Sequence, residues 1–558
     1  MSTVPQVPAT QAEFPAFRRR ANARKQEQIV PRGRPSMELR DMSGPYFVKR
    51  RHVIAGMAAL AAGTALPGSA VMAQATPKPG GTLRMSHSTR IATLNTLNLS
   101  GPAEYPCSDM IHCSLTRVDG ENRPVPYLAE SWSANDDGSE FTFTLRPGIT
   151  FHDGTPCTSA DVVATYKAIL NPDIAAAARS VLDMIDTVEA VDDLNVKFTL
   201  SSPYADFPIA TAHRNAKILS VAALNAPLTE LDTSANGTGP FKIETFDSAR
   251  MVRLVKNEDF FLPGQPYLDA VEMVLFPDLA AETINFLSGD IDVMQTVQQA
   301  DFQRLSDADG VATRRQPGGV FVNLVMRYDT KPWDDVRVRR AMALAFDRQM
   351  LVDLVIEGLG RPAYDNIIAP EYGFAIDAPE KTYDPEAAKA LLTEAGYPDG
   401  IQVKLVASNR PAIRSQVAIA IQQMAGPAGF DIEVETMPHD TYLSEIWMKG
   451  PFYIGYWGNQ TTVDGTLTML LTSDASYEDS AWKNAEFDSL VAEARATTDD
   501  TKRAELYASA QELMLRDLPY IVPFFQDTLI ANRDDVDAWN EYPRSGSLYI
   551  ENVWLDRA

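Results

Sequence analysis

The segment from Ile401 to Met437 places the strongest constraint on the fold. "IQVKLVAS" (401–408) and "FDIEVETM" (430–437) have strand patterns, and a helical pattern runs from about Pro411 to Met424 between them. A strand, helix and strand in this order normally form a right-handed unit with parallel strands. Parallel sheets are covered by their crossover helices, so the chain is predicted to be an α/β protein.

Other segments support this class. "LDAVEMVLFPDLAAETINFLSGDIDVM" (268–294) predicts strand, helix and strand, with Gly289 just past the helix end. "SWSANDDGSEFTFTLRPGITFHDGTP" (131–156) predicts a hairpin, because its "FTFTL" alternates apolar and polar residues. The next helix should begin at Thr158, with Asp161 completing a capping box.

A further group of helices is predicted between residues 336 and 396. The pattern over 336–360 should break at Asp347, and the next helix should begin with Asp384 as N-cap, Pro385 as first residue and Gly396 at its end. A chain of 558 residues exceeds what one hydrophobic core supports. Two α/β regions joined by extended segments therefore indicate two lobes with a cleft between them.

Charge separates the beginning of the chain from the rest. Residues 1–75 hold 11 Lys and Arg against 4 Asp and Glu, whereas the remainder holds 39 against 70. So acidic a body repels nucleic acid and anionic membranes, which excludes both as expected partners. Residues 1–40 are rich in Pro, Gln and Arg without apolar periodicity and are predicted to be disordered.

An export signal is predicted before residue 76. Basic residues 49–51 precede an uncharged stretch from Val53 to Leu66, and small residues follow up to Ala75. The paired arginines favour a twin-arginine signal, with general secretion and an uncleaved anchor as alternatives. A translation start at Met42 would leave a basic region of ordinary length. The mature protein is expected in the periplasm.

Catalytic and metal motifs are not found in the sequence. It contains no GxSxG, GxxxxGK[ST] or HExxH motif and no GxGxxG after a strand, so neither an enzyme nor a cofactor or metal site is predicted. Cys107 and Cys113 could form a disulfide in an exported protein or remain free. Cys157 is expected to be a small buried hydrophobe.

Several motifs, taken together and in order, resemble a known family. They are "GGTLRM", "VPYLAESWSANDDGSEFTFTLRPGITFHDGTPCTSADVVATY", "GTGPFKIETFDSARMVRLVKNEDFF", "VRVRRAMALAFDRQMLVDLVIEGLGRPA" and "YDPEAAKALLTEAGYPDG". Over residues 78–558 the chain is similar to the extracellular solute-binding proteins of the oligopeptide/dipeptide-binding class, family 5, which serve ABC importers. The resemblance implies a large two-lobed periplasmic-binding-protein fold with an extra subdomain in lobe one.

The resemblance also implies boundaries and a function. Lobe one would comprise residues 76–319 and 526–558, and lobe two residues 320–525. The protein would be a monomer that closes on a small polar solute (peptide-like, opine-like, or another amino-acid or sugar conjugate) and delivers it to permease subunits. A sensing or chemoreceptor-coupled binder is the alternative, and a periplasmic enzyme on the same fold is a further one. Genes for permease and ATPase subunits beside this one would favour transport.

Site residues follow from the same resemblance. In dipeptide-binding relatives an Arg-Pro pair after a lobe-two strand holds the ligand carboxylate, and here "SNRPAIR" places Arg410 in that position; a solvated turn arginine is the alternative. An aromatic after the next strand lines the pocket in relatives, and His439, with Tyr442 nearby, falls there.

The stretch "GYWGNQTTVDG" (455–465) supplies the remaining candidates. Trp457 matches a tryptophan of the peptide-binding relatives, and the aspartate that pairs with the peptide amine there falls on Asn459 or Gln460. Asp464 is the nearby carboxylate, and capping of the following helix is its alternative role. Because neither amide carries the charge that an ammonium needs, the sequence predicts a ligand other than a free-amine peptide.

Overall fold

The computed structural model describes residues 76–539 and 547–557. The disordered leader, the export signal and the start at Met42 predicted above lie outside these residues. Within the described ranges, no helix is both long and apolar enough to pass through a membrane.

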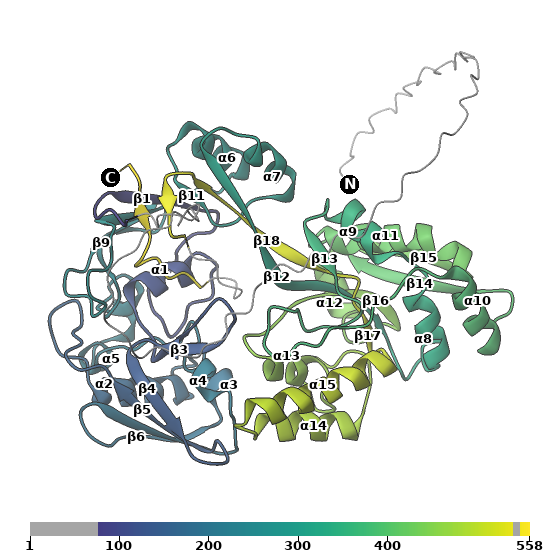
Figure 1. Cartoon of the computed structure of the whole chain (residues 1–558), viewed down its shortest axis with the longest axis horizontal. Coiled ribbons are helices and arrows are strands. Elements are labelled where there is room, and N and C mark those ends of the chain that lie inside the picture. Colours follow the sequence, from purple (N-terminus) through teal and green to yellow (C-terminus); the bar gives the residue numbers. More distant parts are fainter. Residues whose placement is uncertain (1–75, 540–546, 558) are drawn as a thin grey trace, which may run out of the picture. The chain divides into compact units, whose positions relative to one another are not determined.

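A mixed sheet of twelve strands runs through the molecule (Figure 1). Ten strands lie in the order β15-β14-β16-β12-β18-β11-β1-β10-β9-β8, while β13 pairs with β18 and β17 with β12. The strands span β1 Thr82–His87, β8 Phe241–Asp247, β9 Met251–Lys256, β10 Ala270–Leu275, β11 Val293–Met294, β12 Val311–Met326, β13 Gly360–Pro362, β14 Ile401–Ser408, β15 Phe430–Met437, β16 Phe452–Gly458, β17 Tyr520–Ile521 and β18 Phe524–Arg533.

Strands β12 and β18 connect the two halves of this sheet. They pair antiparallel, and their register shifts between Gln316 and Val320. Gly318 and Gly319 fill the shift, since a Cβ at Gly318 would lie 2.4 Å from the Gln526 carbonyl oxygen. The predicted lobe boundaries at 319/320 and 525/526 fall inside these two strands.

A second, four-stranded sheet packs with helices into a separate core. Its order is β4-β5-β7-β6, and the predicted hairpin is confirmed as β4 and β5. Helix α2 begins after Thr158 as predicted, and the Asp161 carboxylate accepts from the Thr158 backbone N–H at 2.9 Å. The elements span β4 Ala129–Ala134, β5 Glu140–Leu145, α2 Ser159–Leu170, β6 Ile185–Ala190 and β7 Asn195–Leu200.

The strand–helix–strand unit predicted between Ile401 and Met437 is confirmed. Strands β14 and β15 pair in parallel, and α11 (Ile413–Ala425) connects them. The predicted break at Asp347 separates α8 (Val336–Ala343) from α9 (Arg348–Val355), and Asp347 caps α9. Helix α10 (Pro385–Glu394) has Asp384 as its N-cap. Their apolar faces cover the β14–β16 half of the large sheet.

The remaining elements are short strands, helices and turns. They span α1 Glu104–Ile111, β2 Thr116–Val118, β3 Pro124–Pro126, α3 Arg179–Leu182, α4 Phe207–Ala210, α5 Val221–Asn225, η1 Leu228–Asp232, α6 Leu279–Ser288, α7 Gln299–Ser306, η2 Gly426–Ala428, α12 His439–Glu445, α13 Val463–Leu470, α14 Ala485–Arg495, α15 Asp500–Asp517, β19 Val536–Asp537 and β20 Trp554–Leu555. Strands β10 and β11 flank α6, which ends at Gly289 in the left-handed conformation, as predicted.

The cysteines settle one open alternative. Cys107, Cys113 and Cys157 are all buried free thiols, so no disulfide joins Cys107 to Cys113. Burial raises the pKa of the Cys107 and Cys113 thiols to about 12. These thiols are therefore protonated at neutral pH and behave as small apolar groups in the core.

Candidate functional site

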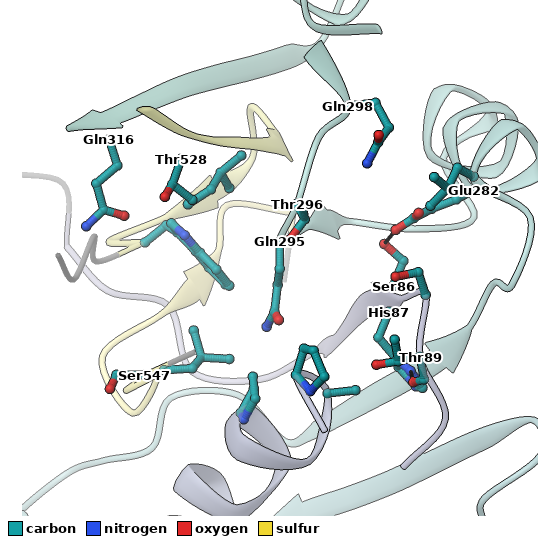
Figure 2. Close-up of a pocket in the computed structure, with 18 residues that line it drawn as sticks. Ser86, His87, Thr89, Glu282, Gln295, Thr296, Gln298, Gln316, Thr528 and Ser547 are labelled. Atoms are coloured by element: carbon teal, nitrogen blue, oxygen red, sulfur yellow. Dashed lines mark hydrogen bonds between the residues drawn. The ribbon is translucent and has the colours of Figure 1, made fainter. Parts of the chain in front are cut away.

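A cavity of about 170 Å³ lies where β1 and β11 end (Figure 2). Strand β1 pairs in parallel with β10 and with β11, so the carboxyl ends of all three lie at the same edge of the sheet. Ligands of open α/β sheets bind beyond this edge. The cavity is lined by Ser86, His87, Ser88, Thr89, Pro102, Ala103, Pro106, Leu279, Glu282, Gln295, Thr296, Gln298, Gln316, Thr528, Ile530, Trp539, Ser547 and Leu548.

Neutral hydrogen-bonding side chains dominate the lining. Figure 2 shows the amides of Gln295, Gln298 and Gln316 around the cavity; the first two follow β11, and the third lies on β12. The buried Gln295 Nε2 has no hydrogen-bond partner among the described residues. A buried amide donor left unpaired costs about 1–3 kcal/mol, so the lining is suited to a polar guest that accepts hydrogen bonds.

Glu282 supplies the acid of this cavity. It stands in the first turn of α6, its side chain is buried, and the Ser86 hydroxyl donates to its Oε1 at 2.6 Å. Burial raises the pKa of Glu282, and the Ser86 hydrogen bond opposes that rise in part. Burial lowers the pKa of His87, and the contact between its Nδ1 and the Thr89 carbonyl oxygen at 2.6 Å opposes that change in part.

Arg410 and His439 meet where parallel strands β14 and β15 end. Arg410 is exposed, and its backbone N–H donates to the Ser408 hydroxyl at 3.1 Å. His439 begins α12, and its Nδ1 lies 2.9 Å from the same hydroxyl oxygen. Ser408 therefore brings the two predicted residues together at one edge of the second half of the sheet.

Tyr442 and Trp457 have surroundings that the sequence did not indicate. Tyr442 is fully buried, and its hydroxyl donates to the Ile454 carbonyl oxygen at 2.7 Å, so it packs in the core. Trp457 lies opposite Phe321 on β12 and is half-buried. Its ring centroid lies 6.2 Å from that of Trp447 and 5.4 Å from that of Tyr477, so it belongs to an aromatic cluster.

The side-chain amide of Asn459 forms hydrogen bonds within the protein through both its oxygen and its nitrogen. Its Oδ1 accepts from the Ala369 N–H at 3.0 Å, and its Nδ2 donates to the Ile367 carbonyl oxygen at 2.6 Å. Gly319 makes this approach possible, because a Cβ there would lie 2.6 Å from Asn459 Oδ1. The Asn459 amide is thus occupied by the loop that follows β13.

The alternative role predicted for Asp464 is wrong. The N-cap of α13 is Thr462, whose hydroxyl accepts from the Gly465 N–H at 2.9 Å, and Asp464 lies inside the first turn. The Asp464 carboxylate is buried and pairs with Arg495 at 3.1 Å. The sequence could not show this, because Arg495 lies 31 residues further along.

The predicted residues are thus divided among several places. Gln460 and Asp464 line a different cavity of about 700 Å³, which residues 180–214 and 460–495 enclose. None of the seven residues lines the cavity at the end of β1. Sequence reasoning missed Glu282, although an acid four residues before Phe286 on an apolar helix face was a usable signal.

Comparisons with known proteins agree with the geometry. A model of bacterial extracellular solute-binding proteins, family 5 Middle, matches residues 123–479. The glutathione-binding protein GsiB of Pectobacterium atrosepticum is 28% identical over 429 residues, which is 75% of this chain and 83% of that protein. The structure of the binding protein AgaA from A. tumefaciens R10, in complex with agropinic acid, is 28% identical with a TM-score of 0.68 and covers 85% of this chain and 99% of that one. HbpA2 from Haemophilus parasuis has the same fold, with a TM-score of 0.78 at 24% identity, over 85% of this chain and 100% of that one.

The fold is that of a two-lobed solute-binding protein. The family match covers more than half of the sequence. The chain belongs to the bacterial extracellular solute-binding proteins, family 5, whose members are substrate-binding components of ABC importers.

Proposed function

We propose that this protein captures a small amino-acid-derived solute, peptide-like or opine-like, in the periplasm and delivers it to the permease of an ABC importer. The observation that carries this proposal is the amide-lined cavity at the carboxyl ends of β1 and β11. Among its relatives, GsiB binds glutathione and AgaA has been seen with agropinic acid. Both names point to ligands built on amino acids.

Arg410 is the proposed anchor for a ligand carboxylate. It is an exposed guanidinium at the end of β14, beside His439. A guanidinium can hold a carboxylate with two parallel hydrogen bonds, which gives direction as well as strength. Residues 76–319 and 526–558 would form lobe one and residues 320–525 lobe two, so closure would bring Arg410 toward a solute seated at the end of β1.

The partners follow from this role. The solute is the ligand, and the permease subunits are the protein partners of a monomeric binder without catalytic activity. The acidic body disfavours nucleic acid. A cleavable signal in residues 1–75, twin-arginine or general, would place the protein in the periplasm.

Calorimetric titration of the exported protein tests this proposal. The compounds are reduced glutathione, agropinic acid and alanyl-alanine, each also prepared as an amide of its carboxylates. We expect at least one acid to bind tightly, and Arg410→Ala to weaken that acid by about tenfold or more while leaving its amide unchanged. The matched control is Lys404→Ala, which removes an exposed cation on the same strand that pairs with Glu435. If Arg410→Ala binds the acid with unchanged affinity, Arg410 is not the carboxylate anchor. If the protein binds none of these compounds and nothing from an extract of the growth medium, the proposed class of solute is wrong.

A further inference from the structure

The geometry points to Glu282 as the group that holds a positively charged amine of the solute in lobe one. This inference rests on the proposed function and deepens it by naming the chemistry of one end of the ligand. Glu282 lies in lobe one, far in the sequence from the lobe-two stretch 455–465 in which the sequence analysis sought the amine partner.

Glu282 is buried, and no cation of the described residues pairs with it. Its residue surface is 3% exposed, and the Ser86 hydroxyl donates to its Oε1. No charged side chain of the described residues is among the groups that shift its pKa. An ionised carboxylate has two oxygens with about four acceptor sites, so one hydroxyl leaves most of its capacity unused. Figure 2 shows the carboxyl group and Ser86 pointing toward one another at the cavity wall.

Other buried acids in the described part of the chain show what such a group normally has. Asp109 pairs with the buried Lys217 at 2.6 Å, and Asp365 pairs with Arg348 and Lys381 at 2.7 Å. Glu104 has no such cation, but its carboxylate accepts from three backbone N–H groups. Glu282 lacks both kinds of compensation, and it lines a cavity. A cation that enters the cavity would supply the missing partner.

The surroundings select the kind of cation. Among the described residues, Glu282 is the sole carboxylate of the lining, and no group of three or more His, Cys, Asp and Glu could hold a metal ion. The neighbouring side chains are amides and hydroxyls, which suit the hydrogen-bonding groups that accompany an amine in an amino-acid conjugate. A volume of about 170 Å³ is below the roughly 300 Å³ of a complete small-molecule site, so it fits one end of such a ligand.

This assignment changes the ligand that the sequence predicted. Asn459 and Gln460 still carry no charge, but the acid that an amine needs is present on α6. A ligand with a primary or secondary ammonium at one end and a carboxylate at the other would then join Glu282 of lobe one to Arg410 of lobe two. A free amine is therefore a requirement for tight binding.

Paired titrations test the inference. Reduced glutathione and alanyl-alanine are each compared with the N-acetylated form, which has the same carboxylates and no positive charge. We expect the wild-type protein to prefer the amine form of the compound that it binds by about tenfold or more. Glu282→Gln keeps the size of the side chain and an acceptor for Ser86. It should remove the preference by weakening the amine form, with the affinity for the acetylated form unchanged.

The control and the contrary results separate this inference from the proposed function. Glu272→Gln removes a carboxylate on β10 that pairs with Arg253 outside the cavity, and the preference should survive it. The role of Glu282 is wrong if the wild-type protein binds an acetylated compound as tightly as its amine form. It is also wrong if the Glu282→Gln protein still prefers the amine form. In both cases the proposed solute binding is unaffected. Wild-type protein that binds neither form of any compound overturns the proposed solute class and this inference with it.

Discussion

Glu282 on α6 and Asp464 on α13 are two buried acids near helix N-termini that have opposite surroundings. Each stands in the first turn of a helix, α6 and α13, whose N-cap side chain accepts a backbone hydrogen bond. Both residues are at most 3% exposed. Burial raises the pKa of both, for Asp464 to about 6. Arg495 lies 3.1 Å from Asp464, whereas Glu282 has the Ser86 hydroxyl.

This difference teaches that burial and a raised pKa do not mark a ligand site by themselves. The partner of the carboxylate decides, because a buried acid whose charge is balanced by a cation of the protein needs no cation from a ligand. Asp464 therefore belongs to the scaffold even though it lines a cavity, and Glu282 to the site.

Arg495→Met should have the largest effect. It leaves Asp464 buried without its cation, which costs about 3 kcal/mol of the free energy of unfolding. The cost should be larger at pH 8 than at pH 5, because Asp464 takes up a proton at the lower pH and no longer needs the cation. Urea denaturation at the two pH values measures it.

Two further variants make the Arg495 result specific. Asp464→Asn leaves the guanidinium, which is 36% exposed, in contact with water, so it should cost less than Arg495→Met. The double variant should recover part of the loss. Equal costs for the two single variants would contradict the scaffold role of Asp464.

Asp479 is a buried acid without a cationic partner among the described residues. It tests whether such an acid can bind a ligand when it does not line a cavity. It is fully buried, the Tyr520 hydroxyl donates to its Oδ1 at 2.5 Å, and it lines none of the cavities described above. Burial raises its pKa to about 7, so its contribution to stability is complete below pH 4 and is lost as the pH rises through 7. We expect Asp479→Asn to be about 2 kcal/mol more stable than the wild type at pH 8 and equal to it at pH 4.

Ligand titrations of the same variant give the contrast with Glu282. Asp479→Asn should bind the solute with wild-type affinity at pH 8. A loss of affinity for the amine form alone would show that a buried acid outside a cavity acts on the ligand. The distinction between scaffold acids and ligand-binding acids would then be wrong.

Local chemistry explains what the sequence could predict. The β14–α11–β15 unit, the break at Asp347 and the caps at Thr158 and Asp384 depend on residues close to one another in the chain, and all are confirmed. Burial patterns and short-range hydrogen bonds determine such features. The two-lobed fold followed from the family resemblance and is also confirmed.

Long-range partners explain what it could not. Asn459 forms hydrogen bonds with residues 367–369, and Asp464 pairs with Arg495. The sequence around residue 460 does not indicate either of these distant partners. Glu282 was overlooked because the resemblance directed attention to lobe two. Its position on the apolar face of α6 was visible in the sequence, but the absence of a cation around it required the structure.

Asn459→Ala tests the scaffold role of that amide. It removes both the donor to Ile367 and the acceptor for Ala369, and we expect a loss of about 1.5 kcal/mol in the free energy of unfolding. Gln460→Ala is the matched control, since Gln460 is exposed and should change stability by less than about 0.5 kcal/mol. An unchanged stability of Asn459→Ala, together with weaker solute binding, would return Asn459 to the site.

Glu282→Gln should have the smallest effect on stability. Burial raises the pKa of Glu282, so its ionisation is a cost that appears as the pH rises, and the neutral amide avoids it while still accepting from Ser86. We expect the ligand-free variant to lie within about 1 kcal/mol of the wild type, and to gain relative to it between pH 4 and pH 8. If Glu282→Gln instead unfolds at markedly lower urea concentrations at pH 8, the carboxylate has a stabilising partner within the protein, and a ligand amine is not needed to explain it.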